Sequence, residues 1–322
     1  MNLDLKRYQE AIAAGITALE LPETPSNLYD PIRYFMTLGG KRMRPALCLI
    51  ACEMIDGKMD AAIHPAIGVE LFHNFTLIHD DIMDKAPVRR AKPTVHERWD
   101  QNIAILSGDA LFVVACQQIM KANPDVSGAL MDVFHRTALE VCEGQQMDMD
   151  FESRSDVGFS EYLEMIRLKT AVLLGCSLKM GAIIAKAPNQ VGNDLYDFGV
   201  SLGIAFQMQD DILDAYGVSE KVGKQTGGDI ISGKKTFLVM KALEEGSDDQ
   251  NDTLSGLLEG SGSEKVSNVL EHFSGLQVKE KVQEDMESWY HKAMSSLDNI
   301  DGQGYDTTYL RSLGNFLMNR DH

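Results

Sequence analysis

Apolar residues recur along most of this chain at spacings of three and four residues, the period typical of amphipathic helices. The pattern extends from Leu3 to Arg320, and the strict alternation typical of strands is scarce. Turn-forming segments separate the helical runs at Leu21–Pro25, Ala122–Asp125, Ala187–Asn189 and Gly260–Ser263. The polar, acidic stretch Glu244–Asp252 is expected to be a surface loop. Because none of these segments is long enough to link domains, we expect one all-α domain over residues 1–322.

Two of the predicted helices end in acidic clusters of the same design. The first helix, roughly residues 61–84, ends in Asp80-Asp81-Ile82-Met83-Asp84, and the second, roughly residues 194–214, ends in Asp210-Asp211-Ile212-Leu213-Asp214. In each cluster the outer aspartates lie four residues apart on one helix face, where like charges repel and the helix dipole is negative. A cation between the two helices would relieve both penalties, and carboxylates suit Mg²⁺ that is shared with a substrate phosphate. The alternative is a pair of solvated helix ends.

Composition narrows the class of protein. The formal net charge of −18 argues against nucleic acid or an anionic membrane surface as the main partner. Hydrophobic residues make up 44 %, enough for a sizeable core. The 5 cysteines show no paired spacing, and we interpret them as reduced core residues of a cytoplasmic protein. No apolar run reaches the ~18 residues of a membrane span, and the N-terminus lacks the apolar region of a signal peptide.

Local cationic groups would have to offset this charge at a phosphate site. The segment Gly39–Pro45 brings Lys41 and Arg44 into a Gly-rich turn, whose side chains and backbone suit phosphate oxygens. Taken alone, it is more simply a solvated basic turn. Arg89-Arg90 lies five residues beyond the first cluster and is otherwise a surface pair. His73 lies two helical turns before Asp80, where a packed core histidine is the commoner alternative.

Further polar groups interrupt apolar runs later in the chain. Lys169-Thr170 has apolar flanks on both sides, so this lysine must find an anion or extend to solvent. A Gly-rich segment after the second cluster contains the two lysine-bearing steps Gly223-Lys224 and Gly233-Lys234-Lys235-Thr236, which suit phosphate oxygens. Gln145 and Asp148 stand at the end of an apolar helical run.

Taken together, these motifs and their order resemble those of the trans-isoprenyl diphosphate synthases, the family of farnesyl, geranylgeranyl and longer polyprenyl diphosphate synthases. The resemblance covers nearly the whole chain. The matching segments are Gly39–Pro45, Leu77–Asp84 with Arg89-Arg90, Gly108-Asp109 with Leu111, Gly144-Gln145, Lys169-Thr170 and Phe206–Asp214. Ala91 departs from the family, which usually has glycine at this place.

The resemblance implies a bundle of long helices around a deep central cavity, a homodimer, and about three Mg²⁺ ions per active site with diphosphate bound. It also implies roles for individual residues. The implied Mg²⁺ ligands are Asp80, Asp84 and Asp210, supported by Asp81, Asp211 and Asp214. The implied contacts are Arg89, Lys169 and Lys224 for the allylic diphosphate, with Lys234 near the same phosphates, and Lys41, Arg44, His73 and Arg90 for isopentenyl diphosphate. Thr170 and Gln207 would face the developing carbocation.

In this family the allylic C–O bond ionises, the double bond of isopentenyl diphosphate attacks the cation, and a proton is lost to the departed diphosphate. The growing chain runs beside the first acidic helix. Phe75 lies five residues before Asp80, about 7.5 Å along that helix, with the small Thr76 beside it and Phe72 about a turn deeper. This pattern resembles geranylgeranyl synthases of archaeal type, so we predict a C20 product, with C15 as the next choice. The alternative for Phe75 is ordinary core packing.

Three other functions stay open at this point. A class I terpene cyclase uses similar ionisation chemistry but does not need a second diphosphate site at Lys41, Arg44 and His73. A non-catalytic subunit of a heteromeric synthase tends to lose an acidic cluster, and both are intact here. A Mg²⁺-dependent phosphohydrolase is the third alternative.

Overall fold

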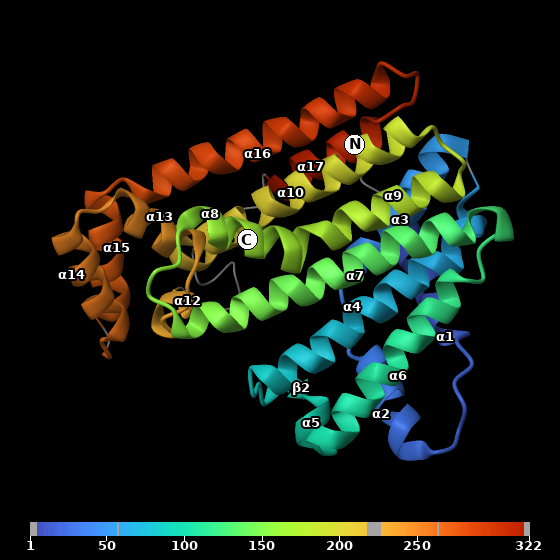
Figure 1. Ribbon diagram of the computed structural model, residues 1–322, viewed down its shortest axis with the longest axis horizontal. Helices are drawn as coiled ribbons and strands as arrows, with labels where there is room; N and C mark the ends of the chain where they lie inside the picture. Colours follow the sequence, from blue (N-terminus) through green and yellow to red (C-terminus); the bar gives the residue numbers. More distant parts are fainter. Residues whose placement is uncertain (1–4, 57, 218–226, 263, 319–322) are drawn as a thin grey trace. The chain divides into compact units, whose positions relative to one another are not determined.

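The computed structural model describes residues 5–56, 58–217, 227–262 and 264–318, and most of them are helical (Figure 1). Within these ranges the only strands are β1 (Val88–Arg89) and β2 (Lys92–Pro93), which pair antiparallel. The predicted all-α class is therefore confirmed. The expected break at Leu21–Pro25 falls between helices, and those at Ala122–Asp125 and Ala187–Asn189 end in the first residues of α7 and α10. The break at Gly260–Ser263 follows α14, and its last residue lies outside the described residues.

The chain separates into two compact units. Residues 2–136 with 176–196 form one, here called the N-terminal unit, and residues 137–175 with 197–322 form the other, the C-terminal unit. The N-terminal unit contains α1 (Leu5–Thr17), α2 (Ser26–Thr37), α3 (Met43–Asp56), η1 (Met59–Ala62), α4 (Ile63–Met83), α5 (Val95–Arg98) and α6 (Gln101–Ile119). The C-terminal unit contains α8 (Phe159–Ile166), η2 (Arg167–Ala171), α12 (Gly228–Ile231), α13 (Phe237–Glu245), α14 (Asp248–Glu259), α15 (Lys265–Gly275), α16 (Val278–Asp301) and α17 (Thr308–Met318). Parts of α7 (Pro124–Ser153), α9 (Val172–Ile184) and α10 (Asn189–Tyr216) belong to each unit.

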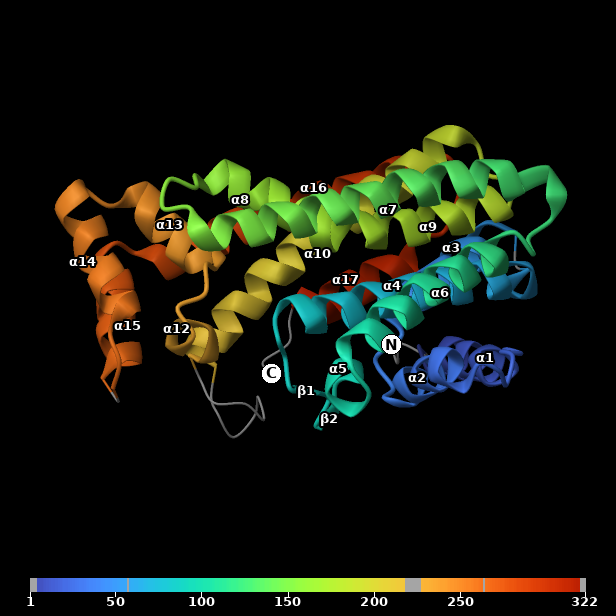
Figure 2. The same ribbon diagram turned by 60° about the horizontal axis from the view of Figure 1, so that its bottom comes forward.

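The core of the N-terminal unit is the pair of helices α4 and α6, which lie side by side in both views (Figures 1 and 2). Two glycines allow this close approach. A Cβ at Gly68 of α4 would come within 2.8 Å of the Ala115 carbonyl oxygen, and one at Gly108 of α6 would come within 2.6 Å of the His79 ring. Helices α1 and α3 also contact α4. The helix that carries the first acidic cluster is therefore fixed along its length.

In the C-terminal unit, α13 packs against α8 and α16. The rings of Tyr162 and Phe237 meet edge to face with their centroids 5.1 Å apart. The ammonium group of Lys241 is buried and lies 2.8 Å from an oxygen of Asp285. These contacts fix the start of α13, which follows the lysine-bearing segment at residues 233–236.

The segment Glu244–Asp252 corrects our expectation of a surface loop. Helix α13 continues to Glu245, and α14 begins again at Asp248. Ser247 and Gln250 form a capping box at the start of α14. Asp248 and Asp249 occupy its first turn, where the helix dipole favours negative charge. The acidic residues that suggested a solvated loop instead stabilise a helix start.

Two further expectations need correction. Cys48, Cys52 and Cys176 are buried as predicted, but Cys142 is exposed, so it is not a core residue. Helix α6 is long and apolar enough to cross a membrane by length and composition, although we expected no such run, and 39 % of its apolar window is buried. Its buried face packs against α4, whereas Leu106 and Val113 are exposed.

A short π-helix, η2, carries Lys169 and Thr170. Glycines on two other helices of the C-terminal unit approach it closely. A Cβ at Gly144 of α7 would collide with the backbone nitrogen of Lys169, and one at Gly203 of α10 would come within 3.1 Å of the Ala171 Cα. π-helical turns of this length are frequent at functional sites. The two glycines clamp this irregular segment, which carries the predicted site residues Lys169 and Thr170.

Gly144→Ala should destabilise the protein by about 1–3 kcal/mol, because the added methyl group has backbone rather than a flexible side chain in its way. Gly128 lies in the same helix with nothing within 4 Å of its Cβ position, so Gly128→Ala is the matched control. That variant should be more stable by about 0.5–1 kcal/mol. Urea denaturation measures both changes. A Gly144→Ala protein that unfolds at the wild-type urea concentration would contradict the close packing.

Candidate active site

The first acidic cluster ends α4, and its three aspartates have different surroundings. Asp81 is buried, with 1 % of its side chain exposed, and it forms an ion pair with Arg89. The Arg89 Nε donates to Asp81 Oδ1 at 2.8 Å, and the Nη2 lies 2.7 Å from the same oxygen. Burial nevertheless raises the pKa of Asp81. Asp80 is half-buried, and Asp84, the residue that caps the helix, is exposed.

Arg89 and Arg90 belong to the β1–β2 hairpin that follows α4 (Figure 2). The two turn residues, Arg90 and Ala91, both have left-handed backbone angles, with φ of 51° and 59°. Two-residue hairpin turns of this kind favour glycine, because a Cβ is strained at positive φ. The departure from the family at Ala91 therefore has a conformational cost. The hairpin holds Arg89 against Asp81 and directs Arg90 to the carbonyl oxygen of Gly39.

The cationic residues predicted to bind isopentenyl diphosphate gather within the N-terminal unit. Arg44 Nη1 lies 3.4 Å from His73 Nε2, and the buried Nε of Arg44 has no hydrogen-bond partner among the described residues. Arg90 packs over Gly40, where a Cβ would come within 2.9 Å of its Nη2. Lys41 is exposed. The structure thus brings Arg44, His73 and Arg90 together, with Lys41 on the adjoining turn.

The pKa of His73 reflects both burial and neighbouring positive charge. Burial lowers the pKa of His73 well below its ordinary value, and four arginines, Arg44, Arg90, Arg89 and Arg42, lower it further. Burial also lowers the pKa of Arg44 and of Arg90. A neutral imidazole among arginines, with a buried guanidinium nitrogen left unpaired, is a suitable environment for an anion.

The second acidic cluster ends α10, and its middle aspartate is again the buried one. Asp211, 5 % exposed, accepts hydrogen bonds from the backbone nitrogen of Phe237 at 2.8 Å and from the amide of Gln207 at 3.1 Å. Phe237 is the first residue of α13, so Asp211 satisfies a helix N-terminus. Burial raises its pKa to about 7. Asp210 and Asp214 are half-buried, and Asp214 accepts from the Asp229 nitrogen at 2.9 Å.

The lysines of the C-terminal unit take different partners. Lys169 Nζ lies 2.5 Å from Asp148 Oδ2, so Lys169 finds the anion that its apolar flanks required. Lys235 donates to the Phe151 and Arg154 carbonyl oxygens at the end of α7. Its neighbour Lys234 is 63 % exposed and lies 3.9 Å from Asp229.

Thr170 is half-buried. Lys224 lies outside the described residues. The predicted groups of this unit are therefore distributed over η2, α10 and the segment before α13.

The predicted chain-length residues form part of an aromatic cluster in the N-terminal unit. Phe72 is fully buried and Phe75 half-buried, and their ring centroids are 5.6 Å apart. Phe112 of α6 lies 5.3 Å from Phe75, and Phe134 of α7 lies 5.2 Å from Phe72. The Thr76 hydroxyl donates to the His73 carbonyl oxygen at 2.8 Å. Sequence reasoning missed Phe112 and Phe134, because nothing local distinguishes them from other apolar residues of their helices.

The donor set suits a hard cation. Oxygen ligands are what Mg²⁺ prefers, and it usually takes one or two carboxylates and completes its shell with water and substrate phosphate. The exposed Asp84 and the half-buried Asp80, one turn apart, offer carboxylates of this kind. Within the ranges that the structure describes, no group of three or more His, Cys, Asp or Glu side chains is placed to hold a metal ion.

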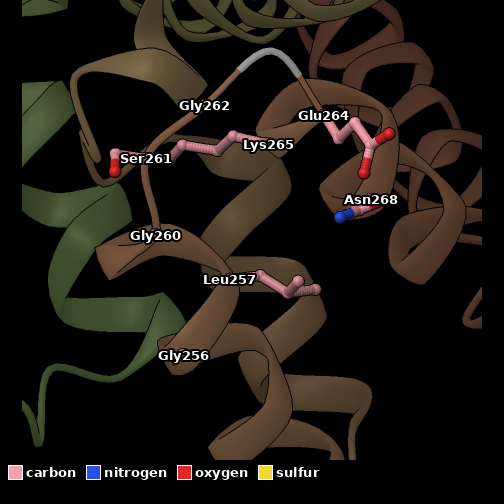
Figure 3. A pocket seen from close by; sticks show the side chains of 8 residues that line it. All are labelled: Gly256, Leu257, Gly260, Ser261, Gly262, Glu264, Lys265 and Asn268. Carbon is pink, nitrogen blue, oxygen red and sulfur yellow. The ribbon is translucent and has the colours of Figure 1, made fainter.

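A surface hollow of about 320 Å³ lies elsewhere, at the turn between α14 and α15 (Figure 3). Lys265 lines it, but its ammonium group already donates to the carbonyl oxygens of Ile231 and Leu258, at 3.1 and 2.5 Å. None of the residues predicted for the site lines this hollow. It is therefore not the candidate active site.

Comparison with known proteins gives one consistent result. A family model described as polyprenyl synthetase matches residues 25–275. A geranylgeranyl diphosphate synthase of Methanosarcina mazei is 43 % identical over 246 residues, 76 % of each chain. A geranylgeranyl pyrophosphate synthase of Geoglobus acetivorans is 38 % identical over 321 residues, 99 % of this chain and 98 % of the relative. A crystal structure of a geranylgeranyl pyrophosphate synthase superposes with a TM-score of 0.91 at 42 % identity, covering 99 % of each chain.

Proposed function

Because this chain belongs to the polyprenyl synthetase family, we propose that it condenses isopentenyl diphosphate with an allylic diphosphate to give an all-trans C20 prenyl diphosphate. The prediction of a short-chain prenyltransferase is confirmed by the family match and the relatives, which do not favour a cyclase or a non-catalytic subunit. The product and the roles of individual residues are the parts proposed here.

The cation cluster around His73 carries the proposal. A synthase of this type must hold two diphosphates, whereas a terpene cyclase holds one. His73, kept neutral by burial and by four arginines, is the centre of a positive environment beside Arg44 and Arg90. We assign isopentenyl diphosphate to this cluster, with Lys41 on the adjoining turn.

The allylic diphosphate is assigned to the acidic clusters and their cations. Asp80, Asp84 and Asp210 would hold about three Mg²⁺ ions, which when bound neutralise the leaving diphosphate and so favour C–O ionisation. Arg89, Lys169 and Lys234 would hold its oxygens. Lys224, which lies outside the described residues, is assigned to the same diphosphate from the sequence alone. Lys169 is already paired with Asp148, so the diphosphate must compete with that carboxylate.

Asp81 and Asp211 support the site rather than bind the metal in this proposal. Asp81 orients Arg89, and Asp211 orients Gln207. Because the Gln207 amide nitrogen donates to Asp211, its oxygen is the atom that remains to face a positive charge. Thr170 would offer a hydroxyl oxygen to the same carbocation. Neither residue is a strong nucleophile, which limits side reactions of the cation.

Incubation with labelled isopentenyl diphosphate, an allylic primer and Mg²⁺ tests the proposed function. After dephosphorylation, chromatography should show the C20 alcohol, and EDTA should abolish elongation until Mg²⁺ is restored in excess. Diphosphate release without elongation would indicate a cyclase or a hydrolase. Absence of any conversion would indicate a non-catalytic subunit. A C15 product would retain the reaction and correct only its length.

Phe75→Ala should lengthen the product beyond C20, because the ring would no longer close the space beside α4. Phe159→Ala is the matched control, since Phe159 is a half-buried aromatic of the C-terminal unit, packed on Phe237. Product chromatography should show C25 or longer chains for the first variant and only C20 for the control. An unchanged product from Phe75→Ala would mean that Phe75 is an ordinary packing residue.

We also propose a cytoplasmic homodimer that covers the exposed face of α6. Leu106 and Val113 on this face, and Met120 directly after the helix, recur every seven residues and are 59, 56 and 53 % exposed. A second copy, rather than lipid, is the proposed cover because Asp109, 58 % exposed, lies on the same stripe.

Light scattering should give twice the chain mass of 35.6 kDa without detergent. Val113→Glu should reduce this mass toward that of one chain, because an uncompensated charge in a dimer interface is costly. Phe316→Glu is the control, since Phe316 is 56 % exposed on α17. A wild-type protein that sediments with membranes, or a Val113→Glu protein that stays dimeric, would contradict the proposal.

A further inference from the structure

A buried ion pair lies beneath the cationic turn of the N-terminal unit. Arg42 Nη1 donates to Glu70 Oε1, and the two side chains are only 10 and 3 % exposed. Neither residue belongs to the groups assigned to substrate above. Because Arg42 uses its other terminal nitrogen on the Met36 carbonyl oxygen at 3.1 Å, its guanidinium is turned into the protein rather than toward an anion.

The backbone at Arg42 needs support of this kind. Its φ is 50°, in the left-handed region that residues with a Cβ seldom adopt, and Gly39 and Gly40 before it have φ of 79° and 141°. Such conformations persist only where surrounding contacts determine them. The contacts of the Arg42 side chain with Glu70 and Met36 are therefore among those that hold the turn in its observed path.

The backbone conformation of this turn sets the positions of the neighbouring cationic residues, Lys41 and Arg44. Lys41 precedes Arg42 directly, and Gln9 of α1 donates to the Lys41 carbonyl oxygen at 2.7 Å. Arg44 follows two residues later and contacts His73, which lies one helical turn beyond Glu70 on α4. One stretch of α4 thus binds the turn at two points, through Glu70 and through His73.

The surroundings of Glu70 add further constraint. Asn74, 1 % exposed, lies one turn along α4, and its amide nitrogen is 3.4 Å from the Glu70 carboxylate oxygen. A buried ion pair contributes little net stability compared with apolar side chains of similar volume, but removal of one partner leaves an uncompensated charge. Loss of the Glu70 charge should therefore lower the stability of the fold as well as disturb the turn, and only the second effect should appear in substrate binding.

We propose that Glu70 is a positioning residue for the isopentenyl diphosphate site: it holds Arg42 and through it sets the turn that presents Lys41 and Arg44. This inference rests on the function proposed above. Glu70 itself does not touch the substrate. Its effect should therefore appear in the binding of one substrate only.

Steady-state kinetics with each substrate varied in turn test this role. Glu70→Gln keeps the shape of the side chain and removes its charge. It should raise KM for isopentenyl diphosphate about tenfold and change kcat and KM for the allylic diphosphate less than about twofold. Glu70→Asp keeps the charge with a shorter reach and should give a smaller rise, so it provides the test if Glu70→Gln does not fold.

A double-mutant comparison separates action through Arg42 from a direct effect. If Glu70 acts through Arg42, then Arg42→Met in the Glu70→Gln background should raise KM for isopentenyl diphosphate little further. Fully additive effects of the two changes would overturn the proposal.

Asp285→Asn is the structural control, because it removes a partner of Lys241, a cation as buried as Arg42. It should lower the melting temperature and leave both KM values unchanged. If Glu70→Gln behaves like this control, Glu70 is merely structural and the proposal is wrong. If the wild-type protein does not elongate a primer at all, the proposed function fails first, and the two failures are distinguished.

Discussion

Negative charge at the C-terminal ends of α4 and α10 is the constraint on which this structure depends. Each helix places carboxylates where its own dipole is already negative, and the outer two of each cluster repel one another. In both helices the middle aspartate is buried and held by the protein, Asp81 by a guanidinium and Asp211 by a helix N-terminus and an amide. These internal partners do not satisfy the exposed Asp84. A bound cation is what would relieve the remaining repulsion.

The cationic residues of the N-terminal unit are also held partly by partners within the protein. The chain carries a net charge of −18, yet the N-terminal unit gathers four arginines around His73, and they add to the effect of burial in lowering the pKa of that imidazole. Arginines at this density repel one another unless carboxylates separate them. Glu70 and Asp81 do so from within the protein, by pairing with Arg42 and Arg89. Arg44 and Arg90 then complete a field that is positive only locally, which reconciles an acidic protein with anionic substrates.

Sequence reasoning predicted the helical class, the two helices that carry the acidic clusters, and the breaks between most elements. The expected boundaries differ by one or two residues at α4, and α10 begins five residues before the expected start, directly after Pro188. Periodicity predicts these helices because the apolar face of a helix requires apolar residues at spacings of three and four along the sequence. The failure at Glu244–Asp252 has a local cause too: acidic residues favour helix starts as well as loops, and only the Ser247 cap decides between them.

What periodicity cannot give is the contact between distant segments. The partners of Phe75 and Phe72 on α6 and α7, and the glycine contacts that clamp η2, depend on how helices far apart in sequence meet. The single-domain prediction stays a prediction, because the chain separates into two compact units.

Three pairs of adjacent identical residues, Asp80-Asp81, Asp210-Asp211 and Lys234-Lys235, divide structural and exposed positions between them. On a helix, consecutive side chains point about 100° apart, so a doublet cannot serve one ligand with both members equally. Asp81 and Asp211 are buried while Asp80 and Asp210 are half-buried. The lysine pair in the segment before α13 is divided in the same way. Lys235 donates to carbonyl oxygens at the end of α7, whereas Lys234 is exposed. In each doublet one residue is anchored in the protein and fixes the backbone from which its neighbour projects. We therefore expect the anchoring member to matter to the proposed site as much as its neighbour, although only the neighbour would be recognised from its chemistry alone.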